Sequence, residues 1–80
     1  MTTVRAVAMR VSNLLIEHNM TRYRLCRKIA MPEMTLKHIL DEDNKRITLD
    51  TIVLLAQGFD MSLKEFLDCE LFDNENLDIN

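Results

Sequence analysis

The sequence has few of the residues that break helices or brace small secreted proteins. Its 80 residues include one Gly, one Pro, two Cys and no Trp. A small sheet protein needs many glycine-containing turns, so this scarcity favours helices with short connections and an all-α fold. Two cysteines are too few for a dense disulfide framework, and we expect Cys26 and Cys69 to be reduced thiols packed among apolar side chains.

Long apolar segments are also missing from the chain. No run approaches the roughly 20 apolar residues that a membrane span requires, and the N-terminus lacks the apolar core of a secretion signal. We therefore expect a cytoplasmic protein with no membrane partner. A chain of 80 residues with 48% hydrophobic composition can bury one core but not two, which predicts a single domain.

The charges are unevenly distributed along the chain. The net charge of -3 argues by itself against a nucleic-acid ligand, because affinity for a polyanion depends largely on neutralising phosphates. However, residues 1–46 hold nine Lys and Arg against five Asp and Glu, whereas residues 47–80 hold one Lys against eight acids. This segregation indicates a basic face for a polyanion and an acidic end turned away from it, although a solvated acidic tail would give the same count.

Apolar residues recur at helical spacing in five stretches, which predicts a compact five-helix domain. The expected N-caps are Thr3, Thr21, Thr48 and Ser62, and Pro32 is expected in the first turn of the third helix. The expected helices run from Thr3 to the break at His18-Asn19, over residues 22–29, from Pro32 to Leu40, from Thr48 to a stop near Gly58, and from Ser62 through Phe66 and Leu67.

The signal for regular structure fades after Glu70. We assign residues 1–69 to the folded domain and residues 70–80 to an acidic tail, with residues 73–76 disordered or loosely packed. The apolar residues of this tail are candidates for contact with a partner chain: Leu71, Phe72, Leu77 and Ile79.

Two short helices joined by about three residues have the spacing of a helix-turn-helix unit. The segment TRYRLCRKIAMPEMTLKHIL, residues 21–40, resembles the helix-turn-helix of the lambda-repressor/Cro-like family, also called the Xre family. The resemblance covers roughly residues 4–69 and is carried by Thr21, Leu25, Thr35, Leu36 and Ile39 in this segment, by Arg10, Val11 and Leu14 before it, and by residues 48–52, Leu55-Ala56 and Glu65-Phe66 after it.

Four positions depart from the family pattern. Cys26 replaces the usual Ala, and Ala30 stands at the usual turn Gly, where a positive φ would cost on the order of 1 kcal/mol. Glu33 and Met34 replace the amide and hydroxyl side chains at the start of the recognition helix, which removes the familiar adenine contact. A carboxylate can still accept from cytosine and a Met can pack on a thymine methyl, so unusual base readout and loss of DNA binding both stay open.

The resemblance implies a DNA site on the second and third helices and on the loop that follows. The base-contacting candidates are Glu33, Met34, Lys37 and His38. The phosphate-contacting candidates are Thr21, Arg22, Tyr23, Arg24, Thr35, Asn44, Lys45 and Arg46. For any one of the basic residues alone, the simpler interpretation is an ordinary surface charge in contact with solvent. The grouping of several basic residues on this scaffold favours a DNA-binding site. Arg10 lies on the apolar side of the first helix and is expected to pair with an acid from the fourth or fifth helix.

Other chemistry has little support in the sequence. His18 and His38 are far apart and have no Cys or His at metal-ligand spacing, and Asp41–Lys45 resembles a calcium loop but has Arg46 where the sharp turn requires Gly. There is no glycine-rich phosphate loop and no nucleophile with a base nearby. We therefore expect no enzyme activity, metal, cofactor or small-molecule ligand.

The sequence therefore predicts a sequence-specific regulator of transcription, a repressor, that binds double-stranded DNA with its third helix in the major groove. A homodimer is expected, because a single domain this small gains little affinity alone. The alternative is a protein-interaction module, antitoxin-like or an adaptor, on the same scaffold. Glu33, Met34 and the acidic C-terminal portion favour this alternative, whereas the cations of the second helix favour DNA.

Overall fold

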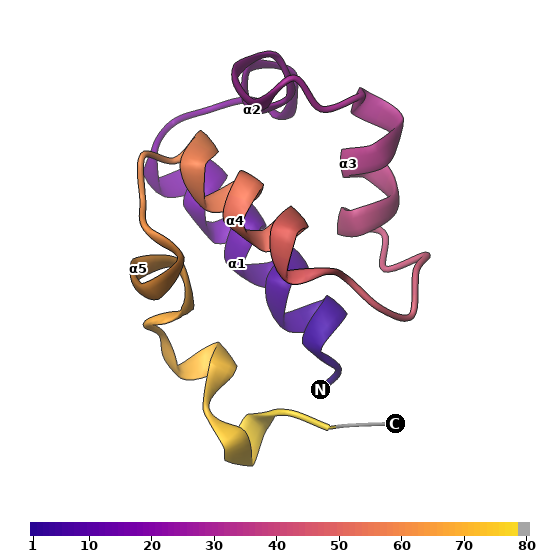
Figure 1. Ribbon diagram of the computed structural model, residues 1–80, viewed down its shortest axis with the longest axis vertical. Helices are drawn as coiled ribbons and strands as arrows, with labels where there is room; N and C mark the ends of the chain where they lie inside the picture. Colours follow the sequence, from indigo (N-terminus) through magenta and orange to yellow (C-terminus); the bar gives the residue numbers. More distant parts are fainter. Residues whose placement is uncertain (79–80) are drawn as a thin grey trace.

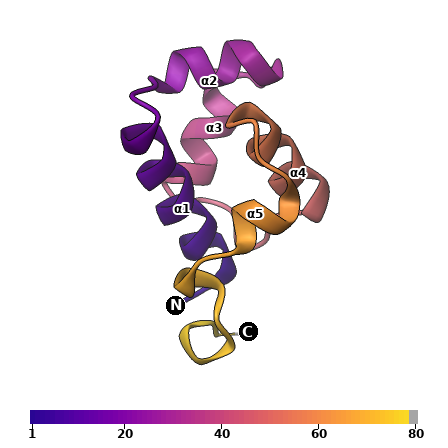
Figure 2. The same ribbon diagram turned by 90° about the vertical axis from the view of Figure 1, so that its left-hand side faces the viewer.

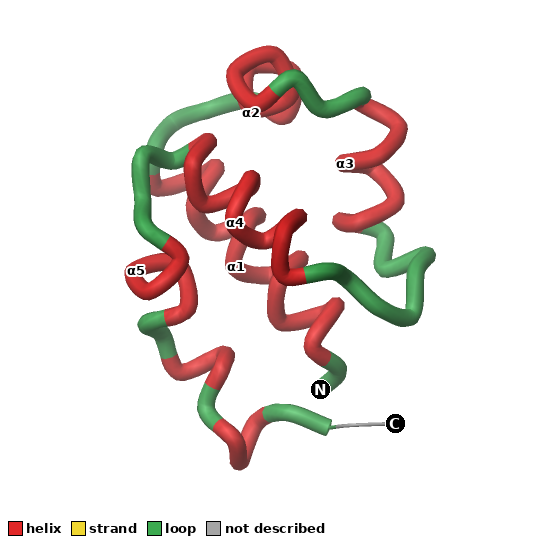
Figure 3. The backbone as a smooth tube through the Cα atoms, in the orientation of Figure 1, coloured by secondary structure: helices red, strands yellow, loops and turns green. Residues whose placement is uncertain are grey.

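The computed structural model describes residues 1–78 and contains five α-helices followed by two short 3-10 helices (Figure 1). The elements are α1 (Thr3–Glu17), α2 (Arg22–Ile29), α3 (Glu33–Leu40), α4 (Leu49–Gly58), α5 (Leu63–Leu67), η1 (Glu70–Phe72) and η2 (Asn74–Asn76). Residues 1–78 contain no strand, and Figure 3 shows helices joined by loops throughout. The predicted all-α, five-helix fold is confirmed.

Hydroxyl side chains begin four of the five α-helices. Thr21, Thr48 and Ser62 each accept a hydrogen bond from a backbone N–H three residues later, as predicted, and Glu65 completes the capping box with a 3.0 Å bond from the Ser62 N–H. The prediction that Thr3 caps α1 is wrong. The cap is Thr2, whose backbone is extended. Thr2 also forms a β-bridge with Asp78, so a contact with a residue distant in sequence determines which of the two adjacent threonines begins the helix.

The core is formed by one apolar face from each helix. α1 packs against α3, α2 against α4, and α4 against α5, so that α1 and α4 lie on opposite sides of the core in Figure 2. The largest fully buried side chains are Val7, Val11, Leu14, Leu25, Leu36, Leu55, Phe59 and Phe66. Both cysteines are free thiols. Cys26 is buried, and its burial, with the nearby Glu33 carboxylate, raises the pKa of its thiol above the ordinary value.

Four residues other than glycine take the left-handed conformation, each just after a helix: Asn19, Ala30, Glu42 and Asp60, with φ between 50° and 59°. In each case the next backbone N–H donates to a carbonyl five residues earlier, as Met31 donates to Cys26 at 3.0 Å. Ala30 has φ 53° and ψ 40°. It therefore adopts the left-handed conformation that is unfavourable for Ala, as the sequence analysis considered. Because the chain has a single Gly, and that Gly does not have a positive φ, residues with side chains adopt the left-handed conformation at these four helix ends.

Two predicted helix boundaries need correction: the start of α3 in its position, and the end of α4 in its physical cause. Pro32 precedes α3 at its N-cap instead of lying in its first turn, because its ψ of 140° is extended, and α3 begins at Glu33. α4 ends at Gly58 as expected, but Gly58 keeps negative φ and Asp60 takes the left-handed position. Gly58 is needed for packing instead, since a Cβ there would overlap Cδ1 of the buried Leu25 side chain.

The acidic tail folds back on the domain as far as residue 78. The sequence indicated disorder or loose packing at residues 73–76, whereas these residues belong to a 3-10 turn whose backbone is hydrogen-bonded. Phe72 packs against the core, with its ring 6.1 Å from that of Phe66. Apolar contact and backbone pairing of this kind depend on distant residues, which composition alone does not register. Ile79 lies outside the described residues.

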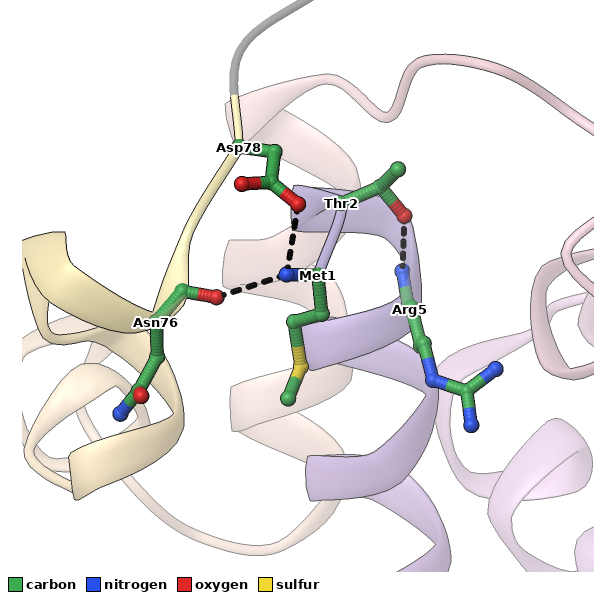
Figure 4. A network of polar contacts seen from close by, with 5 residues as sticks. All are labelled: Met1, Thr2, Arg5, Asn76 and Asp78. Atoms are coloured by element: carbon green, nitrogen blue, oxygen red, sulfur yellow. Dashed lines mark hydrogen bonds and ion pairs between the residues drawn. The ribbon is translucent and has the colours of Figure 1, made fainter.

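The end of the tail is held by the start of the chain (Figure 4). The N-terminal ammonium of Met1 donates to Oδ2 of Asp78 at 2.8 Å and to the carbonyl of Asn76 at 2.9 Å. The Asp78 N–H donates in return to the Met1 carbonyl at 2.7 Å. Residues 76–78 are thereby joined to the beginning of α1.

Arg10 connects α1 to the end of α5, but not to an acidic side chain. Its Nε donates to the carbonyl of Phe66 at 2.8 Å, and its Nη2 donates to the carbonyl of Glu65 at 3.1 Å. The guanidinium also lies over the Phe66 ring, 5.8 Å from the centroid. The expected ion pair is therefore wrong: the partner is the negative end of the α5 backbone, where carbonyl groups lack helical donors.

Candidate nucleic-acid interface

α2, the turn at Ala30-Met31 and α3 form a helix-turn-helix unit whose inner side packs on the core. Leu25, Cys26 and Ile29 of α2 are buried, as are Leu36 and Ile39 of α3. Lys28 adds an ion pair of 2.9 Å with Asp60, just beyond the end of α4. These contacts fix both helices and leave their opposite sides in solvent.

The exposed side of α3 carries the four predicted base-contacting residues. Glu33, Met34, Lys37 and His38 are all exposed, while Leu36 and Ile39 on the other side of the helix are buried in the core. Met34 is 60% exposed and therefore has no role in the core. A helix with one face free in this way can enter the major groove, whose width admits an α-helix.

The predicted phosphate contacts fall into two groups. Thr21, Arg22, Tyr23 and Arg24 are exposed at the start of α2, where the Thr21 hydroxyl accepts from the Arg24 N–H at 3.1 Å. Thr35 is exposed on α3. Asn44, Lys45 and Arg46 are exposed in the loop after α3, beside a groove that they share with Thr2, Thr3 and Asp78. The eight residues of α3, about 12 Å of helix, separate the two groups.

Tyr23 is held by a residue that the sequence did not single out. Nη1 of Arg27 donates to the Tyr23 hydroxyl at 3.1 Å, and the guanidinium lies 5.8 Å from the ring centroid. The two residues are four positions apart on α2, a spacing that places side chains side by side on a helix. This spacing is the feature of the sequence from which the contact between Tyr23 and Arg27 could have been predicted.

The loop after α3 places two carboxylates against the base-contacting residues. Nζ of Lys37 lies 2.8 Å from Oδ2 of Asp41, and Nδ1 of His38 lies 2.8 Å from Oδ2 of Asp43. The hydrogen bond that Lys37 donates to Asp41 raises the pKa of Lys37 and lowers the pKa of Asp41. The sequence analysis missed both pairs, although the i, i+4 spacing of Lys37 and Asp41 is visible in the sequence.

The model of the Cro/C1-type HTH DNA-binding domain family matches residues 10–71 of the chain, which include all five positions of the helix-turn-helix that carried the resemblance. The chain belongs to this Cro/C1-type family. The recognition made from residues 21–40 is thereby confirmed, and the protein is a DNA-binding helix-turn-helix domain.

One solved structure similar to this Cro/C1-type domain is that of prophage Lp1 protein 11. The two share 21% sequence identity and a TM-score of 0.79, over 92% of this chain and 99% of the other. At this identity the likeness shows the fold alone. No curated protein sequence matches the chain.

Two further observations concern the described residues of this Cro/C1-type domain. Among residues 1–78, no three His, Cys, Asp or Glu side chains gather in a way that could hold a metal ion. None of the helices in that range combines the length and apolar character needed to cross a membrane.

Proposed function

We propose that this protein is a sequence-specific regulator of transcription, a repressor, that reads the major groove of double-stranded DNA with α3. The observation that carries the proposal is the exposed face of α3, where Glu33, Met34, Lys37 and His38 project from a helix packed on its other side against the core. It adjoins the start of α2, which adds Arg22 and Arg24 together with backbone N–H groups suited to a phosphate.

Each exposed side chain of α3 has a partner that suits its chemistry. The Glu33 carboxylate accepts from the amino group of cytosine, and the Met34 side chain packs on the methyl group of thymine. Lys37 and His38 donate to a guanine edge or to a phosphate. Thr21, Tyr23 and Thr35 join the two α2 arginines on one stretch of DNA backbone, and Asn44, Lys45 and Arg46 bind a second stretch beyond α3.

The protein binds DNA as a homodimer in this proposal. Two copies related by a two-fold axis would contact half-sites roughly 34 Å apart, one turn of the duplex. The contact surface is α5 with the acidic tail from residue 70 onward, although Phe72 already packs on its own domain. Sedimentation equilibrium at micromolar concentration, with and without DNA, tests the dimer, and a monomer under both conditions would rule it out.

The experiment that tests DNA reading is a selection from a random duplex library at near-physiological salt. Arg22→Glu should lower retention of all duplexes alike, because it reverses a charge at the phosphate backbone. Lys37→Ala should instead change which sequence is enriched. Ser12→Glu, which adds an exposed negative charge on α1, is the control and should change neither.

A second candidate function is a protein-interaction module, antitoxin-like or an adaptor. The specific observation in its favour is the exposure of two large side chains near the helix-turn-helix, Met34 at 60% and Tyr23 at 55%. Apolar and aromatic side chains of this kind are enriched in protein interfaces. If Arg22→Glu and Lys37→Ala both leave DNA retention unchanged, this second function replaces the first.

A further inference from the structure

Three consecutive acidic residues follow α3, and each of them lies beside a basic side chain. We call residues 41–43 the acidic turn. Asp41 lies 2.8 Å from Lys37, Asp43 lies 2.8 Å from His38, and Oε2 of Glu42 lies 3.7 Å from Nη1 of Arg5. Lys37 and His38 are the two basic side chains on the exposed face of α3. Both are therefore bound to carboxylates when no DNA is present.

The backbone fixes the place of these carboxylates. Glu42 adopts the left-handed conformation with φ 59°, and the Asp43 N–H donates to the His38 carbonyl at 3.0 Å. This closing bond reverses the chain just after α3, so that Asp41 and Asp43 lie beside the last turn of the helix. The pairs result from the way α3 ends, and not from the chance approach of a long loop.

The acidic turn lies in a part of the chain with few net positive charges. The hydrogen bond to Asp41 is the main cause of the raised pKa of Lys37, and the charge of Arg22 on α2 acts in the opposite direction. Residues 33–46 hold four carboxylates, at Glu33 and in the acidic turn, against three permanent cations and His38. Affinity for DNA of arbitrary sequence comes from cations that neutralise phosphates, and a surface with this balance is poor in it.

We propose that the acidic turn, through Asp41 and Asp43, is a specificity-determining element that weakens binding to non-matching DNA more than binding to the matching site; the inference rests on the proposed DNA-reading function. At a matching site, hydrogen bonds from Lys37 and His38 to base edges replace their bonds to the two carboxylates. At any other site those bonds are not replaced, and the carboxylates repel the phosphates.

The test compares the wild-type protein with Asp41→Asn/Asp43→Asn in parallel selections from one random duplex library. Both substitutions keep side-chain size and exposed position, and circular dichroism checks that the helices are intact. The control is Glu17→Gln/Asp60→Asn, which removes two exposed negative charges outside α3, α5 and the tail, one of them from an ion pair with Lys28. Two quantities are measured in each selection: the total DNA retained, and the enrichment of the preferred sequence over a scrambled duplex of equal composition.

In the double variant we expect total retention to rise about tenfold, the salt dependence of binding to steepen by about one to two units of slope, and enrichment to fall at least about threefold. The control should change retention by less than about twofold. Equal gains for matching and scrambled duplexes, or no gain beyond the control, would overturn the inference and leave the proposed function standing.

Two other outcomes bear on the proposed function as well as on the inference. If the wild type retains no DNA but the double variant does, the acidic turn suppresses all DNA binding, and both the proposed function of the wild type and the inference about specificity are overturned. If neither protein retains DNA, both the inference and the proposed function are overturned.

Discussion

Gly58 of α4 faces Leu25 of α2 so closely that a methyl group on Gly58 would overlap Cδ1 of Leu25. The same methyl group would lie 3.0 Å from Cγ2 of Ile29. Leu25 is fully buried, so it has little room to move aside. The absence of a side chain at residue 58 therefore sets how near α2, the first helix of the helix-turn-helix, approaches α4.

Gly58→Ala is expected to destabilise the protein by about 1–3 kcal/mol because of overpacking, although Ala ordinarily favours a helix interior by about 1 kcal/mol. Urea denaturation measures the change. Gln57→Ala, at the exposed neighbouring position, should be close to neutral. A Gly58→Ala protein as stable as the wild type would mean that α2 is not held this close to α4.

Ala30→Gly is expected to stabilise the protein by about 1 kcal/mol. Ala30 has a left-handed backbone at the turn of the helix-turn-helix, which costs an L-residue with a Cβ roughly 1–2 kcal/mol and costs Gly little beyond its extra entropy. Thermal unfolding should show a rise of about 4–8 °C for a domain of this size. Asn19→Gly is the matched comparison and should gain less, because Asn tolerates this conformation better. A lower melting temperature for Ala30→Gly would contradict the turn geometry.

Arg10→Gln is expected to cost about 2 kcal/mol, since hydrogen bonds to charged groups contribute about 1.5–3 kcal/mol and two carbonyls at the end of α5 lose their donor. Arg5→Gln on the same helix is the control, because Arg5 is exposed and its contact with Glu42 is 3.7 Å. Chemical denaturation compares the two variants. Similar stability for both would show that Arg10 does not hold the end of α5.

The contribution of Glu65 to stability should depend on pH. Its hydrogen bonds with the Ser62 backbone and side chain hold the pKa of Glu65 below its ordinary value. A lowered pKa in the folded state means that the stabilisation is present above the unfolded pKa, near 4.3, and is lost as the pH falls through the folded value. Glu65→Ala should therefore melt below the wild type at pH 7, by about 3–8 °C, and much closer to it at pH 3. For Glu75→Ala, the difference in melting temperature from the wild type should be the same at pH 7 and pH 3. If Glu65→Ala also lowers the melting temperature equally at both pH values, the ionised Glu65 carboxylate does not stabilise the helix start.

The features that could be predicted from the sequence depend on neighbours in the chain. The limits of α2 and the capping box at Ser62 are set by residues within one helical turn, and both were predicted correctly. The face of α3 was also predictable, because the buried and exposed positions alternate with the helical repeat.

The features that sequence reasoning missed depend on distant residues or on competition between similar groups. Arg10 lies 56 positions from the carbonyl that accepts its Nε, and no local pattern chooses that carbonyl over an acidic side chain. Thr2 and Thr3 offer the same hydroxyl, and the pairing of Thr2 with Asp78 decides between them. The pairing of His38 with Asp43 follows from the reversal at Glu42, whose left-handed conformation is rare for a residue of its type.

The junction of Met1 with Asp78 has a practical consequence for handling the protein. The start of α1 and the tail up to residue 78 lie at the end of the molecule opposite α2 in Figures 1 and 2. A fluorophore, biotin or fused domain attached there would stand away from α2. The two ends are not equivalent, however, because a tag placed before Met1 would turn its ammonium into an amide and remove the 2.8 Å ion pair with Asp78. Immobilisation through the C-terminal end is therefore the attachment that leaves both this junction and the proposed DNA-reading face intact.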